Sequence, residues 1–223
     1  MDLIQAAATL QKFGGIELTG TLARVERTVQ GKGKSECTQV LSEFGINNEL
    51  MTAAALMKRV AGQINVTIHA MGILACLPFI LETEEKVEYV SLGAGNTGRD
   101  FDLETNSRVA EFKFIRWKGG AESIRQNSIF KDFFMLARKE TPKRKFLYVL
   151  GTEYPLRFLN GGRALTSILS RHAKVEKVFR GDFADRYSKV REYYLDHRGK
   201  VTIEDVSKFV PDLVEDAIDE SDI

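Results

Sequence analysis

The stretch Gly98-Arg-Asp-Phe-Asp-Leu-Glu-Thr-Asn-Ser-Arg-Val-Ala-Glu-Phe-Lys-Phe-Ile-Arg-Trp117 decides which fold the chain is expected to adopt. Polar and apolar residues alternate over 100–105 and again over 108–117, and this period of two is typical of strands. Asn106-Ser107 between the two runs is typical of a tight turn. The stretch therefore predicts two antiparallel strands joined as a hairpin.

The length of this turn predicts which residues face each other. A two-residue turn pairs Leu103 with Ala110 and places Asp102 opposite Glu111, with the Cβ atoms of such a pair about 5 Å apart. Lys113 lies two residues beyond Glu111 and therefore on the same face. The other face of both strands is apolar and is expected to cover the core; it carries Phe101, Leu103, Ala110, Phe112 and Phe114.

Two carboxylates on one face repel each other unless a cation lies between them. Oxygen-rich sites of this kind suit Mg²⁺ or Mn²⁺, which activate water and neutralise charge that develops on a phosphodiester. Asp102, Glu111 and Lys113 are therefore the candidate catalytic residues, with the lysine positioning water or stabilising the transition state. A shift in register would bring Asp100 or Glu104 opposite Glu111 instead.

Asp102, eight further residues and then Glu111-Phe-Lys113, on adjacent strands followed by a helix, resemble the PD-(D/E)XK nuclease superfamily. That superfamily includes restriction endonucleases, resolvases and exonucleases. The resemblance covers roughly residues 85–169. It implies that Asp102 and Glu111 hold Mg²⁺, that the backbone carbonyl of Phe112 adds a ligand, and that Lys113 assists the attack. It also implies a supporting role for Gln126 on the following helix.

The chain departs from the superfamily's pattern at two positions. Phe130 stands where many members carry a tyrosine four residues after the glutamine, and Phe101 stands where a proline usually precedes the aspartate. Asp100 therefore remains an alternative metal ligand. Some members add a glutamate from an early helix, and Glu49 is the candidate here.

Around this hairpin the patterns predict an α/β fold. Residues 86–92 and 145–150 are typical of strands, residues 122–139 are typical of a long helix, and 155–173 contain another helix that begins near Gly162. This order predicts a mixed central sheet flanked by helices, with a restriction-endonuclease-like core. We expect residues 1–84 to be a mainly helical part that packs on the core, 85–180 to be the core itself, and 181–223 to be a helical appendage with an acidic tail.

The charges are unevenly distributed although the net charge is only +1. Residues 108–145 hold eleven basic and four acidic residues, a local charge of +7, whereas residues 212–223 hold six acids and no base. A basic segment suits a polyanion, so the expected partner is nucleic acid, with DNA favoured, and a homodimer or partner protein is allowed. The candidate contacts are Arg99, Arg116, Trp117, Lys118, Arg125 and Lys131. An equally favoured interpretation of Trp117 is that its ring covers the edge of the sheet.

Other features exclude competing classes of protein. Two cysteines without metal-ligand spacing argue against a zinc site or a disulfide framework and favour the cytoplasm. Gly93-Ala-Gly95-Asn-Thr-Gly98 matches a dinucleotide motif, but a strand rather than a helix is expected after it. Residues 64–81 predict a buried core helix rather than a membrane span, and His69 within them a core histidine. The alternative to a nuclease is a non-catalytic nucleic-acid-binding or assembly module with the same fold.

Overall fold

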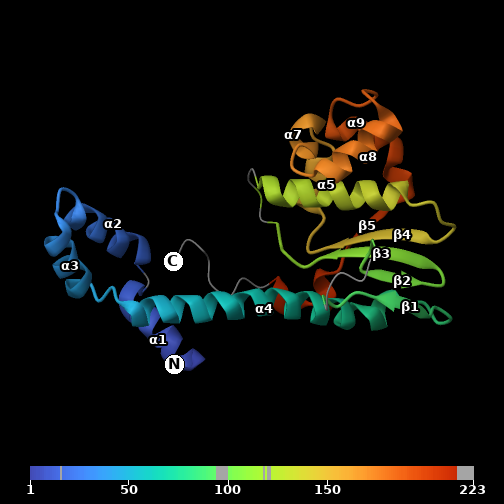
Figure 1. Cartoon of the computed structure of the whole chain (residues 1–223). Coiled ribbons are helices and arrows are strands. Elements are labelled where there is room, and N and C mark those ends of the chain that lie inside the picture. The colour runs from blue at the N-terminus through green and yellow to red at the C-terminus, as the bar shows by residue number, and fades with distance from the viewer. Residues whose placement is uncertain (16, 94–99, 118, 120–121, 215–223) are drawn as a thin grey trace. The chain divides into compact units, whose positions relative to one another are not determined.

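The computed structural model describes residues 1–15, 17–93, 100–117, 119 and 122–214, and they form two compact units. Residues Met1–Thr67 belong to the first unit and Ile68–Glu215 to the second. The division falls inside one long helix, α4 (Asn48–Ile80), rather than at residue 84, where the sequence pattern changes. Figure 1 draws both units, and each is described separately below.

The first unit is helical, as expected. It contains α1 (Leu3–Gly14), α2 (Leu18–Val29), α3 (Lys34–Glu43) and the first part of α4. Helix α1 begins with a capping box: the amide of Gln5 donates to Asp2 Oδ1 at 2.8 Å, and the amide of Asp2 donates to Gln5 Oε1 at 3.0 Å. These two bonds satisfy amides that have no partner within the first turn.

Helix α4 is continuous over 33 residues and is less buried than its composition predicts. Ile73, Cys76 and Ile80 are buried along one stripe at helical spacing, whereas Met71 and Phe79 are 53% and 64% exposed. The expectation of a buried helix over 64–81 is therefore wrong for most of its surface. Among the described residues, α4 is the one helix long and apolar enough to cross a membrane, judged by length and composition alone.

A five-stranded mixed sheet forms the centre of the second unit, which confirms the expected α/β class. Its order is β1-β2-β3-β4-β5, with the first two pairs antiparallel and the last two parallel. The strands are β1 (Val87–Val90), β2 (Leu103–Thr105), β3 (Arg108–Lys113), β4 (Arg144–Val149) and β5 (Thr202–Asp205).

Strand β5 lies within residues 181–223, which the sequence predicts to be a helical appendage. Ile203, Val206 and Val210 have helical spacing, yet the backbone of residues 202–205 pairs with β4 and is followed by the short 3-10 helices η2 (Ser207–Phe209) and η3 (Pro211–Leu213). Pairing with β4 satisfies the backbone groups of an otherwise open edge, and this outweighs the local pattern.

The hairpin has the register that the turn predicts, because Leu103 pairs with Ala110 and Glu104 with Val109. Strand β2 is shorter than expected, however, and Asp102 lies just before it. The expectation that Phe101 shares a face with Leu103 is wrong: Phe101 belongs to the core cluster on the opposite side of the sheet. The strand period does not extend to Phe101, because residues 100–102 bend and are not part of the strand.

Helices cover both faces of the sheet in the second unit (Figure 1). On one face, α5 (Ser123–Arg138) packs over Val109, Leu147 and Val149, and behind it lie α6 (Glu153–Leu159), α7 (Leu165–Leu169), α8 (Ala173–Phe183) and α9 (Val190–His197). On the other face, the end of α4 and the residues of η2 and η3 pack over Ala110, Phe112 and Tyr148. Glu111 and Lys113, which alternate with Ala110 and Phe112, are therefore on the α5 side.

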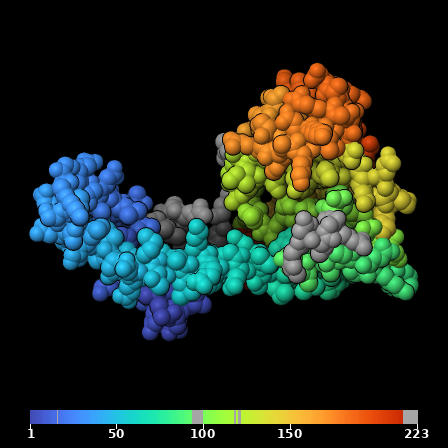
Figure 2. Space-filling view, viewed as in Figure 1, coloured from blue at the N-terminus to red at the C-terminus, as the bar shows by residue number. Residues whose placement is uncertain are grey.

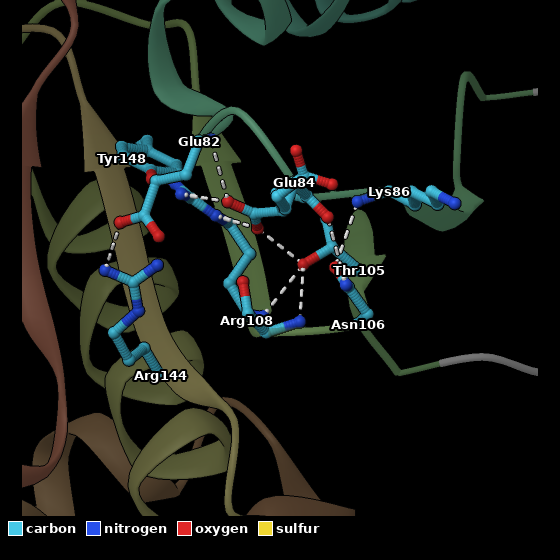
Figure 3. Close-up of polar contacts among 10 residues, drawn as sticks. Glu82, Glu84, Lys86, Thr105, Asn106, Arg108, Arg144 and Tyr148 are labelled. Carbon is cyan, nitrogen blue, oxygen red and sulfur yellow. Dashed lines mark hydrogen bonds and ion pairs between the residues drawn. The ribbon is translucent and has the colours of Figure 1, made fainter.

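A buried ion pair fixes the segment before β1 to the start of β3. The guanidinium of Arg108, 3% exposed, donates to both carboxylate oxygens of Glu85 and to the hydroxyl of Tyr148 at 2.6 Å. Thr105 Oγ1 also donates to Glu85. Figure 3 shows this network together with the nearby contact of Asn106 with the backbone of the preceding segment. These bonds hold the hairpin at the end opposite Asp102.

Candidate functional site

Glu111 and Lys113 form the centre of the candidate site, as the strand period predicts. Lys113 Nζ lies 2.8 Å from Glu111 Oε1, and both side chains are largely buried on the α5 side of β3. The two residues are neighbours on one face because they are two positions apart in a strand.

Asp132 on α5 is a third member of this site and is not among the site residues that the sequence predicts. Its Oδ2 lies 2.8 Å from Lys113 Nζ and accepts a hydrogen bond from Ser128 Oγ at 3.2 Å. Its Oδ1 lies 3.5 Å from the exposed Lys131. The signal in the sequence is an acid between the buried residues Ile129 and Phe133, since a buried acid needs a partner. That partner is Lys113.

Asp102 completes the group, although it lies outside the strand. Its Oδ2 accepts a hydrogen bond from the backbone amide of Phe112 at 2.9 Å, and its Oδ1 lies 3.2 Å from His69 Nε2 on α4. The carboxylate of Asp102 thus binds the amide of Phe112 in place of a backbone carbonyl, at the point where the backbone pairing of β2 with β3 has ended at Leu103. The amide and carbonyl of one strand residue point to the same side, so the carbonyl of Phe112 also faces the side of β3 on which Asp102 lies.

The electrostatics show that three acids share this small region. Burial raises the pKa of Glu111 to about 7, and the charges of Asp132 and Asp102 act in the same direction, while Lys113 opposes them. Burial alone would lower the pKa of Lys113, but Asp132 and Glu111 together hold it above its usual value. The hydrogen bond to Asp102 raises the pKa of His69. Such shifts cluster at functional sites, although structural ion pairs also produce them.

The donors present are of the chemical type that Mg²⁺ takes, but they are not gathered as a complete ligand set. Among the described residues, no group of three His, Cys, Asp or Glu side chains converges on one point. Asp102 and Glu111 supply carboxylate oxygens, and Phe112 supplies a backbone carbonyl on the side of the central strand β3 that faces β2. Mg²⁺ commonly binds through one or two carboxylates and keeps several waters, so this donor set fits it.

The remaining predicted ligands and the supporting residue lie apart from this centre. Gln126 is half-buried on α5, where its Oε1 accepts a hydrogen bond from Arg163, not from the site. Asp100 is exposed and lies outside β2. Glu49 belongs to the first unit, whereas Glu111 belongs to the second.

The predicted nucleic-acid contacts are in different environments. Trp117 is only 7% exposed and packs against Tyr154 and Phe158. This burial fits the alternative prediction that the ring covers part of the fold rather than stacking on a base. Arg116 donates to the carbonyl of Val214, Arg125 pairs with Glu122, and Lys131 is exposed beside Asp132. Arg99 and Lys118 lie outside the described residues.

No protein-family model, curated protein or solved structure matches the chain.

Proposed function

We propose that the protein is a Mg²⁺- or Mn²⁺-dependent nuclease with a restriction-endonuclease-like core, which hydrolyses phosphodiester bonds, with DNA as the expected substrate. The observation that carries this proposal is the position of Lys113 Nζ, 2.8 Å from both Glu111 and Asp132, with the carboxylate of Asp102 bonded to the amide of Phe112 on the same strand. A buried lysine held between two carboxylates, with a third carboxylate and a backbone carbonyl close by, supplies the kinds of groups that phosphodiester hydrolysis needs.

Each residue has a role in this proposal. Asp102, Glu111 and the carbonyl of Phe112 would hold the metal ion, which lowers the pKa of water and neutralises charge on the phosphate when bound. Lys113 would orient the attacking water or donate a hydrogen bond to the charged transition state. Asp132 holds the ammonium of Lys113 in place and acts through it, which makes it a positioning residue.

A cleavage assay with matched variants tests the proposal. Glu111→Gln and Lys113→Met are expected to abolish Mn²⁺-dependent cleavage of linear, circular and single-stranded DNA while the proteins remain folded. Glu153→Gln and Lys174→Met change exposed residues of the same types on α6 and α8 and should cleave like wild type. Cleavage that survives both site variants would disprove the assignment.

One observation favours a second function, a nucleic-acid-binding or assembly module without catalysis. Both oxygens of Asp102 already have partners, His69 and the amide of Phe112, so this carboxylate can serve its neighbours without any metal. A protein of this second kind would bind DNA in a salt-dependent manner and show no cleavage in Mg²⁺ or Mn²⁺.

A further inference from the structure

A cavity of about 250 Å³ lies in the second unit beside the start of α5. Ser123, Asn127, Ser128 and Lys131 of α5 line one wall, and Arg171 and His172, from the turn between α7 and α8, line the other. In Figure 2 the orange segment that contains α7 and α8 lies against the yellow-green segment that contains α5. This cavity has no role in the catalytic centre proposed above.

The charged residues that line the cavity are all basic. Lys131 and Arg171 are exposed, and no acid belongs to the described lining. Within the part of the chain that the structure describes, the guanidinium of Arg171 makes no ion pair or hydrogen bond. A cation that is not neutralised by the protein attracts anions, and arginine is well suited to phosphate because it presents several N–H donors in one plane.

The backbone strengthens this preference for an anion. Helix α5 begins at Ser123, a residue that lines the cavity, and has no acid in its first turn. Helix α8 begins at Ala173, directly after His172. The acids at the two helix starts already have basic partners, since Glu176 of α8 pairs with Arg180 and the N-cap residue Glu122 of α5 pairs with Arg125. The first amides of a helix lack intrahelical partners, and the helix dipole places partial positive charge at this end. Two helix starts at one basic cavity favour a phosphate group.

Asn127 is the feature that points to more than a simple anion. Its side chain lines the cavity and is 5% exposed overall, and its Oδ1 is buried without a hydrogen-bond partner among the described residues. Buried polar atoms are nearly always paired in folded proteins, so a missing partner indicates a missing ligand or water. An amide oxygen accepts hydrogen bonds, and the oxygens of a phosphodiester, which carries no proton at neutral pH, cannot donate one. The ligand should therefore carry a hydroxyl or amino group as well as a phosphate.

The size and position of the cavity further restrict the kind of ligand that it can bind. Sites for whole drug-sized ligands usually measure about 300–1,000 Å³, so this cavity suits one small unit of a longer ligand. Ser128 and Lys131, which line it, both contact Asp132, and Asp132 contacts Lys113. Asp132 therefore links the lining of the cavity to Lys113 of the candidate catalytic centre.

We propose that this cavity binds one nucleotide of the substrate strand, next to the position where the strand is cut. The phosphate of that nucleotide lies between Arg171 and Lys131, and a hydroxyl or amino group of its sugar or base donates to Asn127 Oδ1. The identity of the strand as substrate rests on the proposed function, whereas the binding of a nucleotide does not.

A binding experiment with small probes tests the site directly. Deoxyadenosine 5′-monophosphate and inorganic phosphate are titrated into the full chain without metal and followed by calorimetry and by NMR of the side-chain amides. We expect the nucleotide to bind more tightly than phosphate. Arg171→Gln should weaken nucleotide binding about tenfold, the usual effect of removing one charged hydrogen bond. Arg191→Gln on α9, an exposed arginine away from the cavity, should have no effect.

Asn127→Leu separates a nucleotide site from a plain anion site. This variant should lose the preference for the nucleotide over inorganic phosphate and keep the affinity for phosphate itself. Equal affinities of the wild type for both probes, or nucleotide binding that Arg171→Gln leaves unchanged, would overturn the proposal. Thermal unfolding of each variant shows that it is folded, and Arg171→Gln, which changes an exposed side chain, keeps the test valid if Asn127→Leu does not fold.

A third measurement distinguishes failure of this inference from failure of the proposed function. For binding of a ten-residue oligothymidylate, Arg171→Gln should reduce the slope of log affinity against log salt by about 0.7, the value for one phosphate contact on a single strand. If wild type never cleaves DNA but Arg171→Gln weakens nucleotide binding, the cavity inference stands and the nuclease proposal fails. If Glu111→Gln abolishes cleavage but Arg171→Gln and Arg191→Gln bind nucleotide equally, the nuclease proposal stands and the cavity inference fails.

Discussion

The carboxylate of Asp102 accepts a hydrogen bond from the backbone amide of Phe112 at 2.9 Å. Backbone pairing between β2 and β3 ends at Leu103, the residue of β2 farthest from the turn. The bond from Phe112 to Asp102 extends the contact between the two segments by one residue beyond it. It keeps Asp102 next to the strand that carries Glu111, although the chain bends away before Leu103. One side chain therefore serves both the fold and the candidate site.

These two roles of Asp102 can be separated by two substitutions. Asp102→Asn keeps an oxygen that can accept from the amide of Phe112, so its free energy of unfolding should stay within about 1 kcal/mol of wild type. Asp102→Ala leaves that partly buried amide unpaired and should cost about 1–3 kcal/mol. Both variants lose the negative charge and should lose metal-dependent cleavage. Urea unfolding and the cleavage assay measure the two effects, and an active Asp102→Asn variant would remove this residue from the metal site.

Asp132 should matter for both stability and activity because it holds the buried ammonium of Lys113. Asp132→Asn leaves Lys113 with Glu111 as its remaining acidic partner, and we expect a loss of about 1–3 kcal/mol in stability and a fall in kcat with little change in KM. Asp182→Asn is the matched control, since it removes an exposed partner of Arg138 and should cost at most about 1 kcal/mol. A wild-type kcat for Asp132→Asn would show that the position of Lys113 does not depend on it.

The buried pair of Glu85 and Arg108 predicts a specific dependence of stability on pH. Burial opposes ionisation of Glu85, but the hydrogen bonds from Arg108 and Thr105 outweigh it and lower its pKa from 4.5 to about 2. The folded protein therefore holds this proton less tightly than the unfolded chain does. Its stabilisation is complete above pH 4.5, is lost as the pH falls from 4.5 to 2, and amounts to roughly 3 kcal/mol.

Glu85→Gln provides the measurement. The variant should be less stable than wild type at pH 7 by a few kcal/mol, because it leaves the charge of Arg108 buried without its partner. The difference between the two proteins in urea unfolding should shrink steadily at pH 4 and pH 3. A difference that stays constant over this range would mean that the carboxylate of Glu85 is not the titrating group.

Two glycines of α4 should respond in opposite ways to the same substitution. A Cβ on Gly72 would lie 2.8 Å from three ring atoms of Phe114, a residue packed against Phe112, whereas a Cβ on Gly62 would meet nothing within 4 Å. Gly62→Ala should therefore stabilise the helix by up to about 1 kcal/mol through its better helix propensity. Gly72→Ala should destabilise the protein by about 1–3 kcal/mol because the core must move to accept the methyl group. Thermal unfolding compares them, and a stabilising Gly72→Ala would show that Phe114 can move aside easily.

The parts of the site that were predictable depend on contacts between residues near each other in the sequence. A two-residue turn sets the register of a hairpin, so the pairing of Leu103 with Ala110 follows from Asn106-Ser107. The period of a strand places Glu111 and Lys113 on one face in the same way. The order of strands and helices from residue 86 to 150 is predictable for the same reason, since each element has its own local pattern, whereas α6 lies before the position near Gly162 where the next helix is predicted to begin.

The contacts that only the tertiary structure determines join residues that are distant in the sequence. Nothing near Lys113 in the chain indicates that Asp132 approaches it from α5, that His69 reaches Asp102 from α4, or that Arg171 faces Asn127 across a cavity. The strand at 202–205 belongs to the same group, because its backbone hydrogen bonds to β4 outweigh a helical side-chain pattern. Local patterns specify period and turn, whereas burial and charge pairing depend on which surfaces meet when the whole chain folds.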